Sequence, residues 1–290
     1  MGNLIDAAEL AGRMDDDTLR IVDVRSDLSD PSAGRRAYLQ GHVPGAIHLH
    51  LEDDLSGPIR PDGLGGRHPL PAPDLFAARL GQVGIGDAHH VVAYDDAGGA
   101  IAARLWWLLR WIGHDRVQVL DGGVDAWTAS GGELVSGPES HPPAIATARP
   151  DPRMVVDADD VAARLEDPAR LLVDARAPER YRGEVEPLDR KAGHVPGALN
   201  LPYAGNLERG RLRPPSELRA RFESLAEAEE VVVYCGSGVT AAHDALAMEE
   251  AGLPLPRLYP GSWSDWSSRD DLPVATGDAS SAHPPHRSER

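Results

Sequence analysis

The chain has 290 residues, of which 41% are hydrophobic, and its formal net charge is −17 at pH 7. The length is typical of two domains, and the acidic charge excludes a broad nucleic-acid surface, because such a surface needs positive patches. The single cysteine, Cys235, excludes an intramolecular disulfide, and without an apolar signal core or membrane-spanning run we expect a cytoplasmic protein that binds no membrane.

The N-terminal half alternates short β-branched runs with helical stretches. Its motifs in chain order are RIVDVR (20–25), GHVPGAIHL (41–49), VVAYDDAGGAIAARL (91–105) and VLDGGVDAW (119–127). A helix is expected over residues 100–112, with Gly113 after it. Its Trp106, Trp107 and Trp111 are expected to serve core and interdomain packing rather than a binding site.

The C-terminal half repeats these motifs in the same order, as LLVDAR (171–176), GHVPGALNL (193–201), VVVYCGSGVTAAHDAL (231–246) and LYPGSWSDW (258–266). Four ordered matches indicate two copies of one domain. RLLVDAR, GALNLP, EVVVYC and PRLYPG read as strands, and 239–250 as a helix that Gly252 ends. Near-continuous apolar strands that alternate with helices predict an α/β fold, with a central parallel sheet flanked by helices in each half.

This repeat divides the chain into an N-terminal domain (1–136), a linker (137–154), a C-terminal domain (155–275) and a tail (276–290). The linker is rich in proline and is expected to lie on the surface. The tail lacks apolar periodicity and is expected to be disordered. No Cys/His/Asp cluster has metal-ligand spacing, so no metal site is expected.

Cys235 stands between an apolar run and a glycine-rich turn. A thiol reacts as its thiolate, so a reactive cysteine needs surroundings that stabilise negative charge. Backbone N–H groups from 236 to 240 can curl around the sulfur, and the following helix directs its positive end at it. Gly236 and Gly238 permit the backbone angles that such a cradle needs.

A buried structural cysteine is the simpler interpretation of a lone thiol. Two observations count against it: the glycine-rich turn has no packing purpose, and the N-terminal copy keeps that turn but carries Asp95 in place of the cysteine. The comparison predicts that Cys235 is catalytic and that the N-terminal copy is inactive.

The motifs VDVR, VDAR, both GHVPGA segments, YCGSGVTA and the GGVDAW turn resemble those of tandem-domain rhodanese-family sulfurtransferases, from about residue 20 to 275. The resemblance implies two rhodanese-like domains, with the active cysteine of the C-terminal one at their interface. It implies that Cys235 takes sulfane sulfur from a donor, forms a persulfide and passes the sulfur to a nucleophile. No cofactor is implied beyond that covalent persulfide, and cyanide, glutathione, thioredoxin or another protein thiol all remain open as acceptors.

The loop sequence bears on the sulfur donor. Within the family, thiosulfate enzymes tend to carry cations directly after the cysteine, and mercaptopyruvate enzymes tend to carry Cys-Gly-Ser-Gly. The stretch that follows Cys235 here is of the second type and comprises Gly236, Ser237, Gly238, Val239 and Thr240. The Ser237 hydroxyl can donate a hydrogen bond to a ketone oxygen or a departing enolate.

The donor's carboxylate needs a cationic partner. The segment 176–194 resembles the family's substrate-arginine stretch, and Arg180 matches its first arginine. The second family arginine aligns at or next to Asp189, one residue from Arg190. Arg190 therefore completes the clamp if the loop shifts by one residue, and Arg182 is the alternative.

The family resemblance also implies a Ser–His–acid arrangement across the domain interface. Ser237 matches the serine, GRHPLP (66–71) supplies His68, and the acid falls at Glu52, with Asp53 beside it. His68 would then take a proton from Ser237, while Glu52 holds the imidazole tautomer. An ordinary loop histidine is the alternative for His68.

Three other functions are alternatives to a mercaptopyruvate-type sulfurtransferase. A cysteine phosphatase needs a longer loop that ends in arginine, but the sixth residue after Cys235 is Ala241, and no arginine follows within the helix start. A non-catalytic sulfur carrier or interaction module is possible for the N-terminal copy alone. A thiosulfate-specific enzyme would perform the same reaction with another donor.

Overall fold

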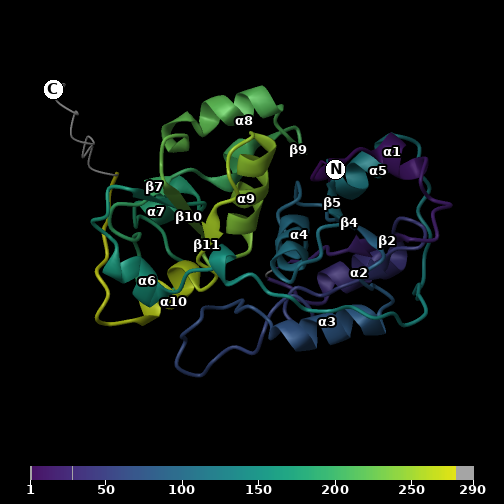
Figure 1. Cartoon of the computed structure of the whole chain (residues 1–290), viewed down its shortest axis with the longest axis horizontal. Coiled ribbons are helices and arrows are strands. Elements are labelled where there is room, and N and C mark those ends of the chain that lie inside the picture. Colours follow the sequence, from purple (N-terminus) through teal and green to yellow (C-terminus); the bar gives the residue numbers. More distant parts are fainter. Residues whose placement is uncertain (1, 28, 279–290) are drawn as a thin grey trace.

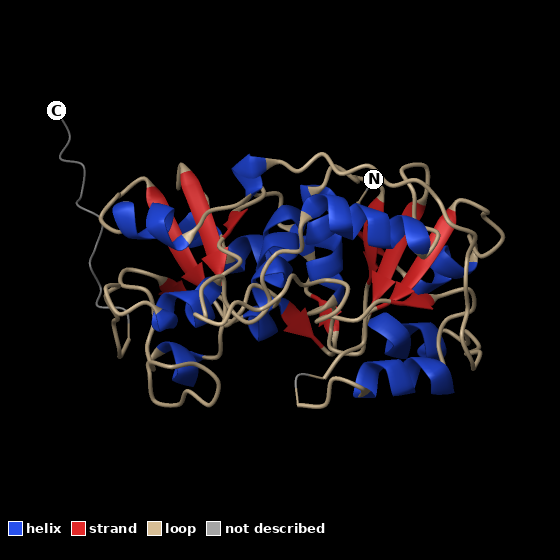
Figure 2. Ribbon diagram, turned by 90° about the horizontal axis from the view of Figure 1, so that it is seen from below, coloured by secondary structure: helices blue, strands red, loops and turns tan. Residues whose placement is uncertain are grey.

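The computed structural model describes residues 2–27 and 29–278 of the chain. Two parallel sheets lie at opposite ends of the molecule, with helices between them (Figure 2). Among the described residues, the N-terminal sheet has the order β1-β5-β4-β2-β3 and the C-terminal sheet the order β11-β10-β6-β7. The strands of the first are β1 (Leu4–Ile5), β2 (Leu19–Asp23), β3 (Ile47–His48), β4 (His90–Tyr94) and β5 (Val117–Leu120). Those of the second are β6 (Arg170–Asp174), β7 (Leu199–Asn200), β10 (Glu230–Tyr234) and β11 (Arg257–Leu258).

The two sheets have the same register, which supports the duplication. Strands β2 and β4 end opposite each other at Asp23 and Tyr94, and β6 and β10 end opposite each other at Asp174 and Tyr234. Even β1 has a counterpart, because Val155 forms a parallel bridge to β11. The α/β class predicted from the sequence is confirmed.

Helices cover both faces of each sheet, as parallel strands require. In the N-terminal half they are α1 (Ala7–Ala11), α2 (Ala33–Gln40), α3 (Pro73–Gln82), α4 (Ala102–Trp111) and α5 (Gly123–Ala129). In the C-terminal half they are α6 (Ala158–Ala163), α7 (Pro178–Tyr181), α8 (Pro215–Arg221), α9 (Thr240–Glu250) and α10 (Ser262–Ser268). Short 3-10 turns (Pro152–Met154, Tyr203–Asn206, Glu223–Leu225) and the antiparallel pair β8 (Leu207–Glu208) and β9 (Arg211–Leu212) complete the structure.

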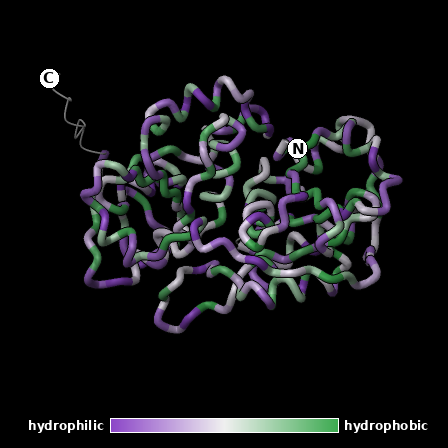
Figure 3. Tube along the Cα trace, viewed as in Figure 1, coloured by the Kyte–Doolittle hydropathy of each residue, from purple (hydrophilic) through white to green (hydrophobic). Residues whose placement is uncertain are grey.

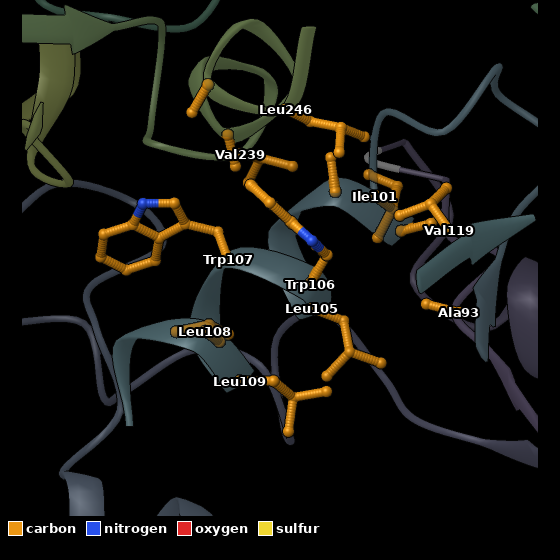
Figure 4. Close-up of a cluster of buried hydrophobic side chains, with 14 of the residues drawn as sticks. Ala93, Ile101, Leu105, Trp106, Trp107, Leu108, Leu109, Val119, Val239 and Leu246 are labelled. Atoms are coloured by element: carbon orange, nitrogen blue, oxygen red, sulfur yellow. The ribbon is translucent and has the colours of Figure 1, made fainter. Parts of the chain in front are cut away.

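Helices α4 and α9 pack against each other and join the two halves (Figure 1). Trp106 and Trp107 of α4 are fully buried in one hydrophobic cluster with Val239 and Leu246 (Figure 4). The α4 helix buries almost its entire surface, since it contacts its own sheet on one side and α9 on the other. This packing places the loop before α9, which carries Cys235, at the junction of the two halves.

The equivalent histidines of the GHVPGA motifs play the same structural role in both halves. His42 Nδ1 lies 2.8 Å from the Tyr38 carbonyl oxygen, and His194 Nδ1 lies 2.7 Å from the Tyr181 carbonyl oxygen. Each imidazole also stacks on the ring of that tyrosine. A contact that both copies share supports the fold rather than the chemistry of one copy.

The proline-rich segment 137–154 runs along the N-terminal half without helix or strand until its last three residues, which form a 3-10 turn. The backbone N–H of Ala144 donates to Gly81 of α3, and that of Arg149 donates to Ile112 after α4. Of the predicted tail, residues 276–278 are described, and 279–290 lie outside the described residues.

Hydrophobic residues gather along the inner segments of both halves, and hydrophilic residues dominate the outer loops (Figure 3). Within residues 2–27 and 29–278, none of the helices is both long and apolar enough to cross a bilayer.

Candidate active site

Cys235 directly follows β10, at the carboxyl end of an interior strand of its sheet. Cys235 is only 2% exposed, and its Sγ accepts a 3.1 Å hydrogen bond from the backbone N–H of Gly238. The backbone N–H of Cys235 donates to Ser262 Oγ at 3.1 Å, which fixes the strand end against α10. The sulfur therefore sits inside the turn of its own loop, where an N–H dipole stabilises negative charge.

The two loop glycines serve different purposes. Gly238 has a φ of +78°, and a Cβ there would lie 2.4 Å from the Pro260 carbonyl oxygen, so only glycine fits. Gly236 is not among the residues with positive φ, so the prediction that both glycines supply special backbone angles is wrong for Gly236. Its lack of a side chain instead leaves space beside two arginines: a Cβ there would lie 3.1 Å from Arg67 Nη2 and 3.3 Å from Arg180 Nη1.

Val239 and Thr240 lead from the loop into α9. The Val239 side chain belongs to the interdomain hydrophobic cluster, so only its backbone remains for the loop's chemistry (Figure 4). Thr240 is the first residue of α9, whose N-terminal end carries the positive end of the helix dipole.

The N-terminal copy shows what this loop can hold. Asp95 directly follows β4, as Cys235 follows β10, and it is fully buried. Its carboxylate accepts four backbone hydrogen bonds of 2.8–2.9 Å, from Ala97, Gly99, Ile101 and Ala102. This loop geometry therefore binds a buried anion through its N–H groups alone.

The carboxylate oxygens of Asp95 stand two bonds beyond Cβ. A terminal sulfur attached to a cysteine Sγ also stands two bonds beyond Cβ. In the N-terminal copy, the carboxylate oxygens are thus the same number of bonds from Cβ as the terminal sulfur of a persulfide on Cys235 would be.

Ser237 and His68 meet across the junction of the two halves. His68 Nδ1 lies 2.7 Å from Ser237 Oγ, and both residues are buried. Glu52 Oε1 lies 3.8 Å from His68 Nε2, too far for a hydrogen bond, and Glu52 Oε2 lies 3.3 Å from His50 Nδ1. Asp53 is oriented toward His50 as well. The structure therefore brings serine and histidine into direct contact and places the acid nearby without a direct bond.

Burial lowers the pKa of His68 to about 4, and the positive charges of Arg104 and Arg67 act in the same direction. The imidazole is therefore neutral at physiological pH. A group with so low a pKa is a weak proton acceptor, so His68 is better suited to orient the Ser237 hydroxyl than to remove its proton completely.

Two arginines from different halves flank the cysteine loop. Arg180, at the end of the short helix α7, comes from the C-terminal half as expected. Arg67, which the sequence analysis did not single out, comes from the N-terminal half. Both guanidinium groups reach Gly236, the residue after Cys235. The available signal for Arg67 was its position directly before His68 in GRHPLP.

Asp189 connects these two arginines. Its Oδ1 pairs with Arg67 Nη1, and its Oδ2 accepts from Arg180 Nη2 at 3.1 Å. Arg180 Nη2 also donates to Glu186 Oε1 at 2.7 Å. The position that aligns with the family's second arginine thus holds an acid, and Arg67 brings a second cation from the other half.

Arg190 and Arg182 lie away from this cluster. Arg190 is largely exposed, pairs with Asp270 at 3.1 Å and donates to the Ser268 carbonyl oxygen. Arg182 pairs with Glu184 at 2.7 Å. Neither is placed to complete a clamp with Arg180, because each is engaged by its own acid outside the cysteine loop.

Arg104 is a second residue that the sequence analysis missed. It lies in α4, is fully buried, and no carboxylate is within ion-pair distance of it among the described residues. It donates at 3.1 Å both to the Gly238 carbonyl oxygen and to the His68 carbonyl oxygen. Burial lowers its pKa to about 10, so it stays charged at neutral pH. The only signal in the sequence was a cation inside the apolar helix AARLWWLLRW.

Within the described part of the chain, no group of three or more His, Cys, Asp or Glu side chains is arranged to hold a metal ion.

A family model described as a rhodanese-like domain matches the chain twice, over residues 6–130 and 157–269. A probable 3-mercaptopyruvate sulfurtransferase of Pseudomonas aeruginosa is 48% identical over 280 residues, which cover 95% of this chain and 98% of that protein. The thiosulfate sulfurtransferase of Bos taurus is 35% identical, over 87% of this chain and 86% of that protein.

Among solved structures, that of SseA from Escherichia coli, described as a 3-mercaptopyruvate sulfotransferase with a rhodanese fold, is similar throughout. The TM-score is 0.81 at 33% sequence identity, and the match covers 91% of this chain and 99% of that one.

Proposed function

Because the chain belongs to the rhodanese family and is a sulfurtransferase, we propose that it takes sulfane sulfur from 3-mercaptopyruvate and carries it as a persulfide on Cys235. The acceptor is a thiophilic nucleophile such as cyanide or a thiol, including that of thioredoxin. The observation that favours mercaptopyruvate as the donor is the Ser237 hydroxyl, which lies two residues after the cysteine and is oriented by His68.

In the first step, the Cys235 thiolate attacks the sulfur of mercaptopyruvate. The new S–S bond forms as the C–S bond breaks, and the electron pair of that bond passes into the pyruvate enolate. The Ser237 hydroxyl donates a hydrogen bond to the ketone oxygen, where the negative charge develops. The thiol proton of the donor ends on the methyl carbon, so the products are pyruvate and the Cys235 persulfide anion.

The carboxylate of the donor is held by Arg180 and Arg67, whose guanidinium groups both reach Gly236. Arg190 and Arg182 have no part in this clamp. The separate ion pairs of Arg190 and Arg182 support their exclusion from the clamp. The approach of Arg67 to Gly236 supports its inclusion.

The persulfide anion is stabilised by the N–H groups of the loop that begins at Gly236. Support comes from Asp95 of the N-terminal copy, whose carboxylate accepts four such bonds in the equivalent loop. In the second step, the acceptor attacks the terminal sulfur. With cyanide, the S–S bond breaks to give thiocyanate and the Cys235 thiolate, and the total charge is unchanged.

Thiosulfate is the second candidate donor, because two guanidinium groups beside Gly236 also suit a sulfonate. Comparing kcat/KM for both donors, with cyanide as acceptor, tests the assignment. We expect a clear preference for mercaptopyruvate, and a preference for thiosulfate would overturn the assignment of mercaptopyruvate as the donor.

Mass spectrometry after donor treatment should show one added sulfur on Cys235. The persulfide mechanism fails if no adduct forms and the Cys235→Ser variant retains activity.

A further inference from the structure

We propose that Asp189 determines donor specificity, because its buried carboxylate neutralises the two-arginine site and thereby favours monoanionic over dianionic donors. This inference rests on the proposed role of Arg67 and Arg180 as the donor clamp. It assigns to Asp189 a function that is separate from binding the donor directly.

In each of the two guanidinium groups, one nitrogen binds Asp189 and another faces the cysteine loop. Arg67 Nη1 and Arg180 Nη2 bind the carboxylate of Asp189. Arg67 Nη2 and Arg180 Nη1 are the atoms nearest to the Cβ position of Gly236. Asp189 thus holds two like charges together on one side and leaves a nitrogen of each directed at the cysteine loop.

Asp189 is the group best placed to set the charge of this site. Its side chain is 3% exposed, so solvent screens its field little. It contacts both clamp arginines, whereas Glu186 is shared between Arg180 and Arg176. Arg176 is itself paired with Asp174 at 2.7 Å.

The charges of the ion-pair network that includes the clamp are therefore balanced before a donor arrives. The positive groups are Arg67, Arg180 and Arg176, and the negative groups are Asp189, Glu186 and Asp174. A further positive charge, Arg104, lies deeper, behind Gly238.

A balanced site treats the two donors differently. Mercaptopyruvate carries one carboxylate charge, which two directed guanidinium nitrogens can bind. Thiosulfate at neutral pH carries two negative charges, and the buried Asp189 carboxylate repels the second. Arg104 does not offset this repulsion directly, since it donates to the carbonyl oxygens of Gly238 and His68. The acid at position 189 therefore lowers affinity for the dianion more than for the monoanion.

The test is the Asp189→Asn variant, which keeps the shape and removes the charge. We expect the ratio of kcat/KM for thiosulfate to kcat/KM for mercaptopyruvate to rise about fivefold. Asp270→Asn is the matched control, since it removes the same charge from the 77% exposed partner of Arg190. That variant should leave the ratio unchanged.

A second variant keeps the test decisive if Asp189→Asn fails to fold. Arg67→Gln removes one positive charge from the same site, so the ratio should move in the opposite direction, toward mercaptopyruvate. Parallel changes for both donors in whichever variants fold would overturn the inference and leave Asp189 a purely structural bridge.

The wild-type protein separates this inference from the proposed function. If mercaptopyruvate places a sulfur on wild-type Cys235 and the donor ratio does not respond to residue 189, the inference alone fails. If the wild-type protein forms no persulfide, the proposed function fails.

Discussion

The imidazole Nδ1 of His68 lies 2.7 Å from Ser237 Oγ, although the two residues are 169 positions apart in the chain. The N-terminal half, which lacks a cysteine, therefore contributes a side chain to the loop of Cys235. It therefore forms one wall of the candidate site.

The first prediction concerns this contact. His68→Ala should lower kcat/KM for mercaptopyruvate by about a hundredfold, because the Ser237 hydroxyl loses the group that orients it toward the ketone oxygen. Turnover of thiosulfate, which has no ketone, should fall far less. Steady-state assays with both donors check this, and an equal loss for the two would argue against a donor-specific role.

Glu52→Gln provides the graded comparison for His68→Ala. Its carboxylate lies 3.8 Å from His68 Nε2 and makes no direct hydrogen bond to it. We expect a reduction of less than about tenfold in the mercaptopyruvate reaction, smaller than that of a directly bonded group. A loss as large as that of His68→Ala would show that Glu52 holds the imidazole during turnover.

The second prediction concerns pH. The pKa of His68 is lowered from 6.5 to about 4 in the folded protein. Between these values the unfolded chain binds a proton at His68 and the native state does not, so this residue's contribution to stability falls as the pH falls. Relative to His68→Gln, the wild-type free energy of unfolding should decline below pH 6.5 by up to about 1.4 kcal/mol per pH unit. Urea unfolding of both proteins from pH 7 to 4.5 measures it, and a constant difference would contradict the low pKa.

The third prediction concerns Arg104, which positions two segments without touching the reacting atoms. Arg104→Met leaves the carbonyl oxygens of Gly238 and His68 without their donor. Both the cysteine loop and the His68 segment should shift, which should lower kcat for both donors by about tenfold or more. Restoration of the charge in Arg104→Lys should recover part of the rate, and an unchanged rate in Arg104→Met would exclude a positioning role.

The fourth prediction concerns Asp95. Asp95→Ala removes the acceptor of four backbone N–H groups and should cost about 1–3 kcal/mol or more of unfolding free energy. Asp95→Asn keeps one acceptor oxygen and should cost less. Chemical denaturation provides the measurement. If Asp95→Ala is as stable as the wild type, the N-terminal loop does not depend on a bound anion, and its value as an analogue of the persulfide loop is lost.

The sequence alone determined the duplication, the α/β class and the position of Cys235 at the end of a strand. These features depend on local patterns, since apolar runs, glycine turns and repeated motifs are read along the chain. The sequence was also sufficient to compare Asp95 with Cys235, because equivalent positions in two copies of one domain lie at the same place in the fold.

The tertiary structure alone decided which arginines lie beside the cysteine loop. Position in the motif favoured Arg190, but that side chain pairs with Asp270 at the surface, while Arg67 reaches the loop from the other half. Likewise, Arg104 is recognisable only once α4 is seen to be buried against α9. Side-chain neighbours across an interface depend on how two domains pack, and no periodicity within either domain encodes that arrangement.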